Sequence, residues 1–204
     1  MSDSSLRERL AARCEVAGVP IDPSILAGLE RYLELLARWN ARINLTALPV
    51  QPPTDAALDK LLVEPLVAAP FYPPQAEGWI DLGSGGGSPA LPLRLACRSG
   101  ALALVESRER KCAFLREAVR VLGLERTTVT NARFEALAVV SPVDVVTVRA
   151  VRIDAEMEGL VRRILRVGGL LFCFGTPLAS STFEISSEAS LPDGSLLTVA
   201  RRVT

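Results

Sequence analysis

Residues 78–96 read GWIDLGSGGGSPALPLRLA and change character twice within that span. Residues 79–82 are apolar except for Asp81, which predicts a short buried strand. Glycine then fills four of the five positions from 83 to 87, and residues 90–96 have a helical composition with Pro89 near the first turn. A doubly wound α/β fold binds its ligand at such a strand–loop–helix junction, because glycine lets a ligand approach the backbone and the helix start offers free N–H groups.

A second acidic residue follows at the spacing that this fold requires. Residues 101–106, ALALVE, predict the next strand, and Glu106 closes it 23 positions after Gly83. A carboxylate at that point can accept hydrogen bonds from ribose hydroxyl groups. An ordinary tight turn would explain the glycines alone, but it would not explain an acid in register with them.

Two nucleotide-like ligands fit the loop to different degrees. Residues 85–90, GGGSPA, loosely satisfy the G-x-G-x-x-G/A pattern of dinucleotide-binding proteins, so NAD has to be weighed. Asp81 stands immediately before the loop, where its carboxylate would repel a pyrophosphate. The same carboxylate suits the ammonium and sulfonium groups of S-adenosylmethionine, which is therefore the favoured cofactor.

The rest of the chain predicts an α/β, doubly wound Rossmann-like sheet with a helical N-terminal extension. We expect residues 1–75 to form that extension, packed on the core, and residues 76–204 to form the cofactor-binding domain. Asp22-Pro23 is a helix start, and an apolar stripe follows it as far as Ile43. Further elements are expected at residues 58–72 (helix), 107–122 (helix), 127–131 (strand), 143–148 (strand), 154–165 (helix), 168–175 (strand) and 195–203 (antiparallel edge strand).

Composition excludes several classes of protein. The 204 residues contain 23 basic and 23 acidic side chains, so binding of nucleic acid through bulk positive charge is excluded, and 49% hydrophobic residues exclude intrinsic disorder. The absence of histidine excludes Ser–His and Cys–His catalysis and His-ligated zinc. The four cysteines are widely spaced, so we expect reduced thiols and no metal site. No membrane span or signal peptide is recognisable, which predicts a cytoplasmic protein.

Six blocks of sequence, in order, resemble the RsmG (GidB) family. The family signature W-N-x-x-x-N-L-T is similar to residues 39–46, and its D-x-G-S-G-x-G-x-P-G-I-P loop is similar to residues 81–92. The remaining blocks are residues 106–107 with 110–111, residues 114–115, residues 133–135 and residues 144–150. The resemblance covers nearly the whole chain. It implies a class I methyltransferase that uses S-adenosylmethionine to methylate N7 of a guanine in small-subunit ribosomal RNA.

The candidate cofactor site combines the loop with positions that the resemblance implies. Arg149 and Asn44 are also candidates for the substrate side, although Asn44 would equally serve as a helix-terminating cap and Arg149, without the family, would be read as a surface arginine at a strand end. The candidate cofactor-binding residues are Asp81, Gly83, Ser84, Gly85, Gly87, Ser88, Glu106, Ser107, Phe134, Glu135 and Arg149. No catalytic base is assigned, because guanine N7 carries an unprotonated lone pair. The implied partner is ribosomal RNA or the small ribosomal subunit, and the enzyme is expected to be a monomer without a metal ion.

Four positions depart from the family pattern. Leu61 and Pro65 replace the histidine and serine of an R-H-x-x-D-S block, Ala90 replaces a loop glycine, and Phe174 replaces the lysine of a K-G pair. These changes concern the presumed RNA-facing side more than the cofactor loop. A methyltransferase redirected to another substrate, a non-catalytic RNA- or ribosome-binding relative and, more distantly, an NAD-dependent oxidoreductase are the alternatives.

Overall fold

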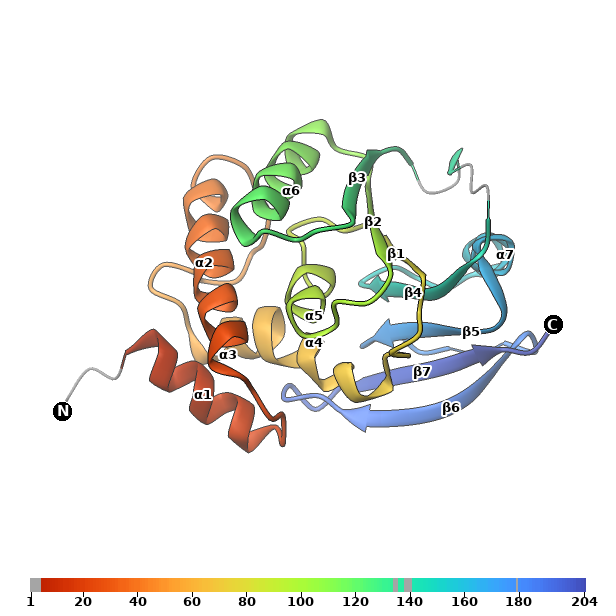
Figure 1. Cartoon of the computed structure of the whole chain (residues 1–204), viewed down its shortest axis with the longest axis horizontal. Coiled ribbons are helices and arrows are strands. Elements are labelled where there is room, and N and C mark those ends of the chain that lie inside the picture. The colour runs from red at the N-terminus through yellow and green to blue at the C-terminus, as the bar shows by residue number, and fades with distance from the viewer. Residues whose placement is uncertain (1–4, 134–135, 138–140, 179) are drawn as a thin grey trace.

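The computed structural model describes residues 5–133, 136–137, 141–178 and 180–204. Its seven-stranded sheet has the order β3-β2-β1-β4-β5-β7-β6, with β3 to β5 parallel and β7 antiparallel to both of its neighbours (Figure 1). The strands are β1 (Gly78–Leu82), β2 (Ala101–Glu106), β3 (Thr127–Asn131), β4 (Val143–Arg149), β5 (Leu165–Phe174), β6 (Phe183–Ser190) and β7 (Leu196–Arg202). The predicted doubly wound α/β fold is confirmed. Its strand order reverses between β1 and β4, and such a fold binds ligands at the carboxyl ends of the strands there.

Helices cover both faces of the sheet (Figure 1). One apolar cluster packs α1, α2, α5 and α6 on one face, and a second packs α7 on the other, because successive strand residues point to opposite sides. The described helices are α1 (Leu6–Val16), α2 (Pro23–Asn40), α3 (Asp55–Leu58), the π-helix η1 (Asp59–Val63), α4 (Glu64–Val67), the 3-10 helix η2 (Ala69–Phe71), α5 (Ala90–Ala96), α6 (Glu109–Leu122) and α7 (Ala155–Ile164). In this described part, no helix combines the length and the apolar character needed to cross a membrane.

Residues 5–71 are helical where they are regular, as the sequence predicts, apart from one isolated bridge between Val50 and Pro53. Asp22 caps α2 by accepting a hydrogen bond from the Ser24 amide at 2.7 Å, and Pro23 occupies the first turn. An added Cβ at Gly28 would lie 2.8 Å from a methyl group of Leu95, so glycine lets α2 and α5 approach closely. These helices share one apolar core with the sheet, and the boundary at residues 75 and 76 stays a prediction.

The last third of the sheet differs from the sequence prediction in two respects. Residues 196–202 form an antiparallel strand, but β7 lies inside the sheet and β6 forms the edge. Strand β6 was not predicted, because its residues are mostly exposed and rich in serine and glutamate, so they lack the apolar alternation of a half-buried strand. In addition, α7 ends at Ile164 and β5 begins at Leu165, three residues before the predicted strand.

Candidate cofactor site

The glycine loop after β1 takes a backbone path that only glycine follows easily. Gly83, Gly85 and Gly87 have φ values of 72°, 52° and 89°, in the left-handed region. The amides of Gly83 and Ser84 donate to the carbonyl of Val105 at 2.9 and 3.0 Å, which fastens the loop to β2. An added Cβ at Gly87 would lie 2.4 Å from Leu91, whereas one at Gly85 would meet nothing closer than 3.6 Å. Gly87 thus packs closely against Leu91, whereas a Cβ at Gly85 would make only an ordinary contact with the Gly83 carbonyl.

Glu106 binds the loop directly, so the pairing predicted from sequence spacing exists in space. Its Oε2 accepts a hydrogen bond from the Gly85 amide at 2.9 Å, and its Oε1 accepts one from the Arg108 amide at 2.8 Å. The side chain is 7% exposed at the end of β2. Each carboxylate oxygen can accept more than one hydrogen bond, so Glu106 retains acceptor capacity toward hydroxyl groups of a ligand.

Asp81 is a buried carboxylate with one unused oxygen. Its Oδ1 accepts a hydrogen bond from the Thr147 hydroxyl at 2.5 Å, and its Oδ2 is buried without a hydrogen-bond partner in the described part of the chain. Burial is the main cause that raises the pKa of Asp81 to about 6, with a smaller contribution from the charge of Glu106. Ser84, which is also buried, donates to the Asp81 carbonyl at 3.2 Å. An unpaired buried carboxylate at the base of the loop favours a cationic ligand group.

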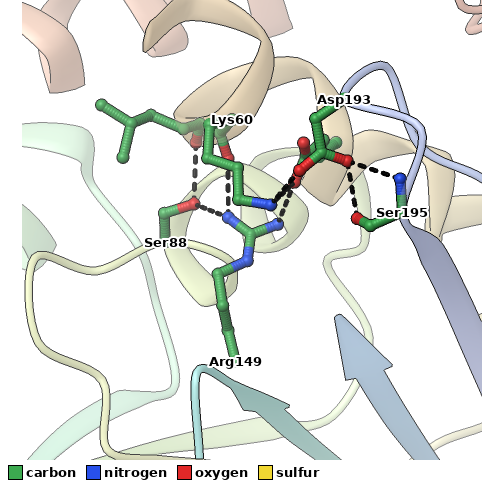
Figure 2. Close-up of polar contacts among 7 residues, drawn as sticks. Lys60, Ser88, Arg149, Asp193 and Ser195 are labelled. Carbon is green, nitrogen blue, oxygen red and sulfur yellow. Dashed lines mark hydrogen bonds and ion pairs between the residues drawn. The ribbon is translucent and has the colours of Figure 1, made fainter. Parts of the chain in front are cut away.

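Arg149 lies beneath the loop and is not the surface arginine that its position at a strand end would suggest. Its guanidinium group donates to the Lys60 carbonyl at 2.6 Å, to the Ser88 hydroxyl at 2.9 Å and to Glu64 Oε2 at 3.1 Å (Figure 2). The side chain is 11% exposed, and burial lowers its pKa. Arg149 therefore joins the end of β4, the glycine loop and the helical N-terminal region.

Three departures from the family pattern surround this arginine. Phe174 places its ring under the guanidinium group, with Cζ 4.7 Å from the ring centroid, where a lysine would add a second cation. Ser88 donates to the Leu61 carbonyl at 2.9 Å, a backbone contact that does not depend on the side chain at position 61. Pro65 has no backbone N–H, so it cannot donate a helical hydrogen bond to the carbonyl of Leu61 or Lys60. Those two carbonyls accept from Ser88 and Arg149 instead.

The charge on Arg149 is balanced by a buried acid that sequence reasoning did not select. Glu64 is fully buried, and desolvation raises its pKa although Arg149 and Lys60 oppose that shift. The Lys60 ammonium group lies 3.2 Å from Glu64 Oε2 and donates to Asp193 Oδ2 at 2.7 Å. Asp193 in turn accepts from the amide and hydroxyl of Ser195, in the turn between β6 and β7 (Figure 2). The only sequence signal for this network is that positions 60 and 64 keep the basic and acidic residue types of the family's R-H-x-x-D-S block.

Helix α2 supplies another contact that the sequence did not reveal. The Tyr32 hydroxyl donates to the Gly86 carbonyl at 2.6 Å, and the Tyr32 side chain is fully buried. Trp39, in the W-N-x-x-x-N-L-T block, packs edge-on against Phe114 and donates to Glu117 at 2.9 Å. The only available signal for Tyr32 was its place within the apolar stripe of α2.

The other four candidate residues are Asn44, Ser107, Phe134 and Glu135. Asn44 is exposed, and α2 ends at Asn40, so Asn44 does not terminate that helix. Ala41 is the C-cap, and the Oδ1 of Asn40 accepts from the amides of Leu45 and Thr46 at 2.9 and 3.0 Å, which fastens the loop that carries Asn44 to the end of α2. Ser107 is exposed beside Glu106, at the carboxyl end of β2. Phe134 and Glu135 lie outside the described residues.

The chain is similar in sequence to known proteins over most of its length. Residues 25–184 match the family model GidB, described as rRNA small subunit methyltransferase G. The chain is 39% identical over 176 residues to ribosomal RNA small subunit methyltransferase G of Stenotrophomonas maltophilia K279a, covering 84% of this chain and 79% of that protein. It is 36% identical over 198 residues to the protein of the same name from Xanthomonas axonopodis pv. citri, covering 95% and 88%.

Solved structures show the fold alone. The ribosomal protein L11 methylase of Lactobacillus delbrueckii subsp. bulgaricus superposes with a TM-score of 0.55 at 14% identity, covering 69% of this chain and 77% of that one. A Klebsiella pneumoniae protein assigned as an O-methyltransferase superposes with a TM-score of 0.59 at 16% identity, covering 98% and 100%.

Proposed function

Because the chain belongs to the rRNA small subunit methyltransferase G (GidB) family, we propose that it methylates N7 of a guanine in small-subunit ribosomal RNA with S-adenosylmethionine as the methyl donor. One observation carries the proposal: the family match over residues 25–184 contains Asp81, the glycine loop, Glu106 and Arg149 in a single continuous stretch. The doubly wound sheet with its ligand loop at the β1–β4 reversal supports it.

The residues around the loop fit S-adenosylmethionine. The unpartnered Oδ2 of Asp81 suits the ammonium group of the methionine moiety, and Glu106 has acceptor capacity for the ribose hydroxyls. When bound, the cofactor supplies an activated methyl group on a sulfonium centre.

The chain needs no general base for this reaction. Guanine N7 is a hydrogen-bond acceptor with a free lone pair, so the residues have to orient the two reactants and exclude water. Asp81 and Glu106 would fix the two ends of the cofactor, and the Arg149 cluster would hold the loop at Ser88 in one position. A protein without histidine can accomplish this.

The decisive experiment is the transfer of labelled methyl from S-adenosylmethionine to small ribosomal subunits that lack the modification, followed by chemical cleavage at N7-methylguanine. We expect incorporation at a single guanine. Label that enters another component of a cell extract, and not ribosomal RNA, would show a redirected methyltransferase. Binding to subunits without transfer, with cofactor binding intact, would show a non-catalytic relative.

Two substitutions at Glu106 separate its charge from its hold on the loop. We expect Glu106→Ala to weaken S-adenosylmethionine binding by about 1–3 kcal/mol, because it removes charge-assisted hydrogen bonds to the cofactor. Glu106→Gln keeps one acceptor oxygen for a loop amide and should lose less affinity than Glu106→Ala. Isothermal calorimetry measures both variants. Wild-type affinity in the alanine variant would contradict the ribose assignment.

A further inference from the structure

A polar cavity lies at the amino ends of the parallel strands, whereas the glycine loop lies at their carboxyl ends. It has a volume of about 340 Å³ and opens between α2, the end of α5 and the loop that joins α6 to β3. The loops that line it lead into the amino ends of β2 and β3, whereas the candidate cofactor site lies at the carboxyl ends. The six residues of β2, at about 3.3 Å each, place the two sites roughly 20 Å apart.

The cavity is strongly basic in a chain that has no net charge. Its lining includes Arg31, Arg94, Arg98 and Arg126, and Glu125 is its only carboxylate. Among the described residues, none of these four arginines forms a salt bridge with a carboxylate within 4.0 Å. The charge of Arg98 contributes to lowering the pKa of Asp22, but the Asp22 carboxylate caps α2 by accepting from the Ser24 amide. Four arginines against one glutamate leave the described lining of the cavity with an excess of positive charge.

Arg94 makes this cavity a built site and not merely a cluster of solvated side chains. It is 4% exposed, and its guanidinium group donates to the carbonyls of Ser99 and Glu125, each at 2.8 Å. Burial lowers the pKa of Arg94, and the charges of Arg126 and Arg98 lower it further. Carbonyl acceptors fix the position of the guanidinium group without cancelling its charge, and an anion would relieve the repulsion.

The backbone beside the cavity is strained in a way that supports the same conclusion. Arg126 has a φ of 51°, a left-handed conformation that is unfavourable for a residue with a long side chain. Gly123, three positions earlier, ends α6 with a φ of 61°. The loop thus holds Arg126 at the cavity in a conformation that glycine or asparagine would adopt at lower cost.

We propose that this cavity binds a phosphodiester group of ribosomal RNA at a distance from the methylated guanine; the inference rests on the proposed function. The planar guanidinium group of arginine can donate two hydrogen bonds to the oxygens of one phosphate. Contacts with the phosphate backbone of an RNA position it without reading its sequence. An RNA that reached both the cavity and the glycine loop, at opposite ends of the parallel strands, would have to extend along the surface of α2 and α6. Such a footprint favours a large folded substrate over a short oligonucleotide.

The test compares two double variants that each reverse two positive charges. Arg31→Glu with Arg98→Glu alters two exposed residues of the cavity, and Arg162→Glu with Arg163→Glu alters two exposed residues of α7, on the other face of the sheet. Filter binding to unmodified small subunits at several salt concentrations, methyl transfer kinetics and cofactor calorimetry are measured for each. We expect the cavity variant to raise KM about tenfold and to reduce the salt slope of binding by about one to two. Its kcat and cofactor affinity should equal those of the wild type.

Three outcomes would overturn the inference. Unchanged KM and salt slope in the cavity variant would do so, and so would equal losses in the α7 variant, because the attraction would then be general. A wild-type protein that fails to bind subunits would overturn the inference too. Binding by the wild type without methyl transfer would refute only the proposed function, and loss of that binding in the cavity variant would still support the cavity. Should the charge reversals unfold the protein, Arg126→Asn, which suits the left-handed backbone, repeats the test with one charge removed.

Discussion

The Asp81→Asn variant is expected to bind S-adenosylmethionine about 30- to 150-fold more weakly than the wild type, while its free energy of unfolding at pH 8 is no lower. The loss corresponds to about 2–3 kcal/mol, the range for a charge-assisted hydrogen bond in a buried site. The substitution keeps an oxygen to accept from Thr147 but removes the charge that Oδ2 would offer to an ammonium group. Calorimetry gives the affinity, and urea denaturation gives the stability.

The stability part of this prediction follows from the pKa of Asp81. Because the pKa in the folded protein is raised to about 6, above its ordinary value, the folded state binds a proton more tightly than the unfolded chain does. Ionised Asp81 therefore costs stability. The cost is absent below about pH 4, grows as the pH rises to about 6, and reaches at most about 3 kcal/mol above that.

The Asp81→Asn variant should therefore be more stable than the wild type at high pH. The cofactor affinity of the wild type should fall as the pH drops below about 6, because Asp81 becomes protonated. An Asp81→Asn protein that loses stability at pH 8 but retains cofactor affinity would show that Asp81 is a purely structural residue. Asp144→Asn is a matched control. Its carboxylate pKa is lowered by hydrogen bonds from Gly78, Glu77 and Arg166, so that variant should lose stability at pH 8 without losing affinity.

The Arg149→Met variant is expected to lose about 3–5 kcal/mol of stability, because it leaves Glu64 buried without its guanidinium partner. Lys60 remains near Glu64, which favours the lower end of this range. Urea denaturation measures the loss. The control is Arg166→Met, which breaks the Arg166–Asp144 pair at 2.6 Å. Arg166 is half exposed, so that loss should be about 1 kcal/mol or less.

A double variant separates the ion pair from the position of the loop. Replacing both members, Arg149→Met with Glu64→Leu, should restore much of the stability, since apolar residues often replace a buried ion pair at little cost. Methyl transfer should stay impaired, because Ser88 loses its contact with the guanidinium group. Equal losses in Arg149→Met and Arg166→Met would contradict the assignment of a buried pair.

Local features of the chain were predictable and long-range ones were not. The strand, the glycine loop and Glu106 follow from spacings of at most 25 residues, and fold and loop were predicted from them. The ion pair of Arg149 with Glu64 spans 85 positions, and the Tyr32–Gly86 hydrogen bond spans 54. No periodicity or motif encodes such contacts, because they depend on how the helical region docks on the sheet.

The misplaced edge strand has a different cause. The pattern of residues 195–203 does predict a strand, but nothing in it specifies which neighbours it has. Strand β6 exposes serine and glutamate along most of its length, as edge strands that resist aggregation do. Its sequence therefore resembles that of a loop. Because β6 was not predicted, β7 was placed at the edge of the sheet, one position inside the true edge.

The bond between Lys60 and Asp193 has a consequence for how the protein is made. It joins residues 133 positions apart, and the turn that holds Asp193 is synthesised long after Lys60 and the glycine loop. Closing a loop between distant residues costs chain entropy before the contact forms, so we expect this contact to form late in folding. The glycine loop is synthesised before that turn, and the network around Ser88 and Arg149 is complete only when the hairpin of β6 and β7 is in place. A nascent chain therefore carries its binding motif long before it has the finished site.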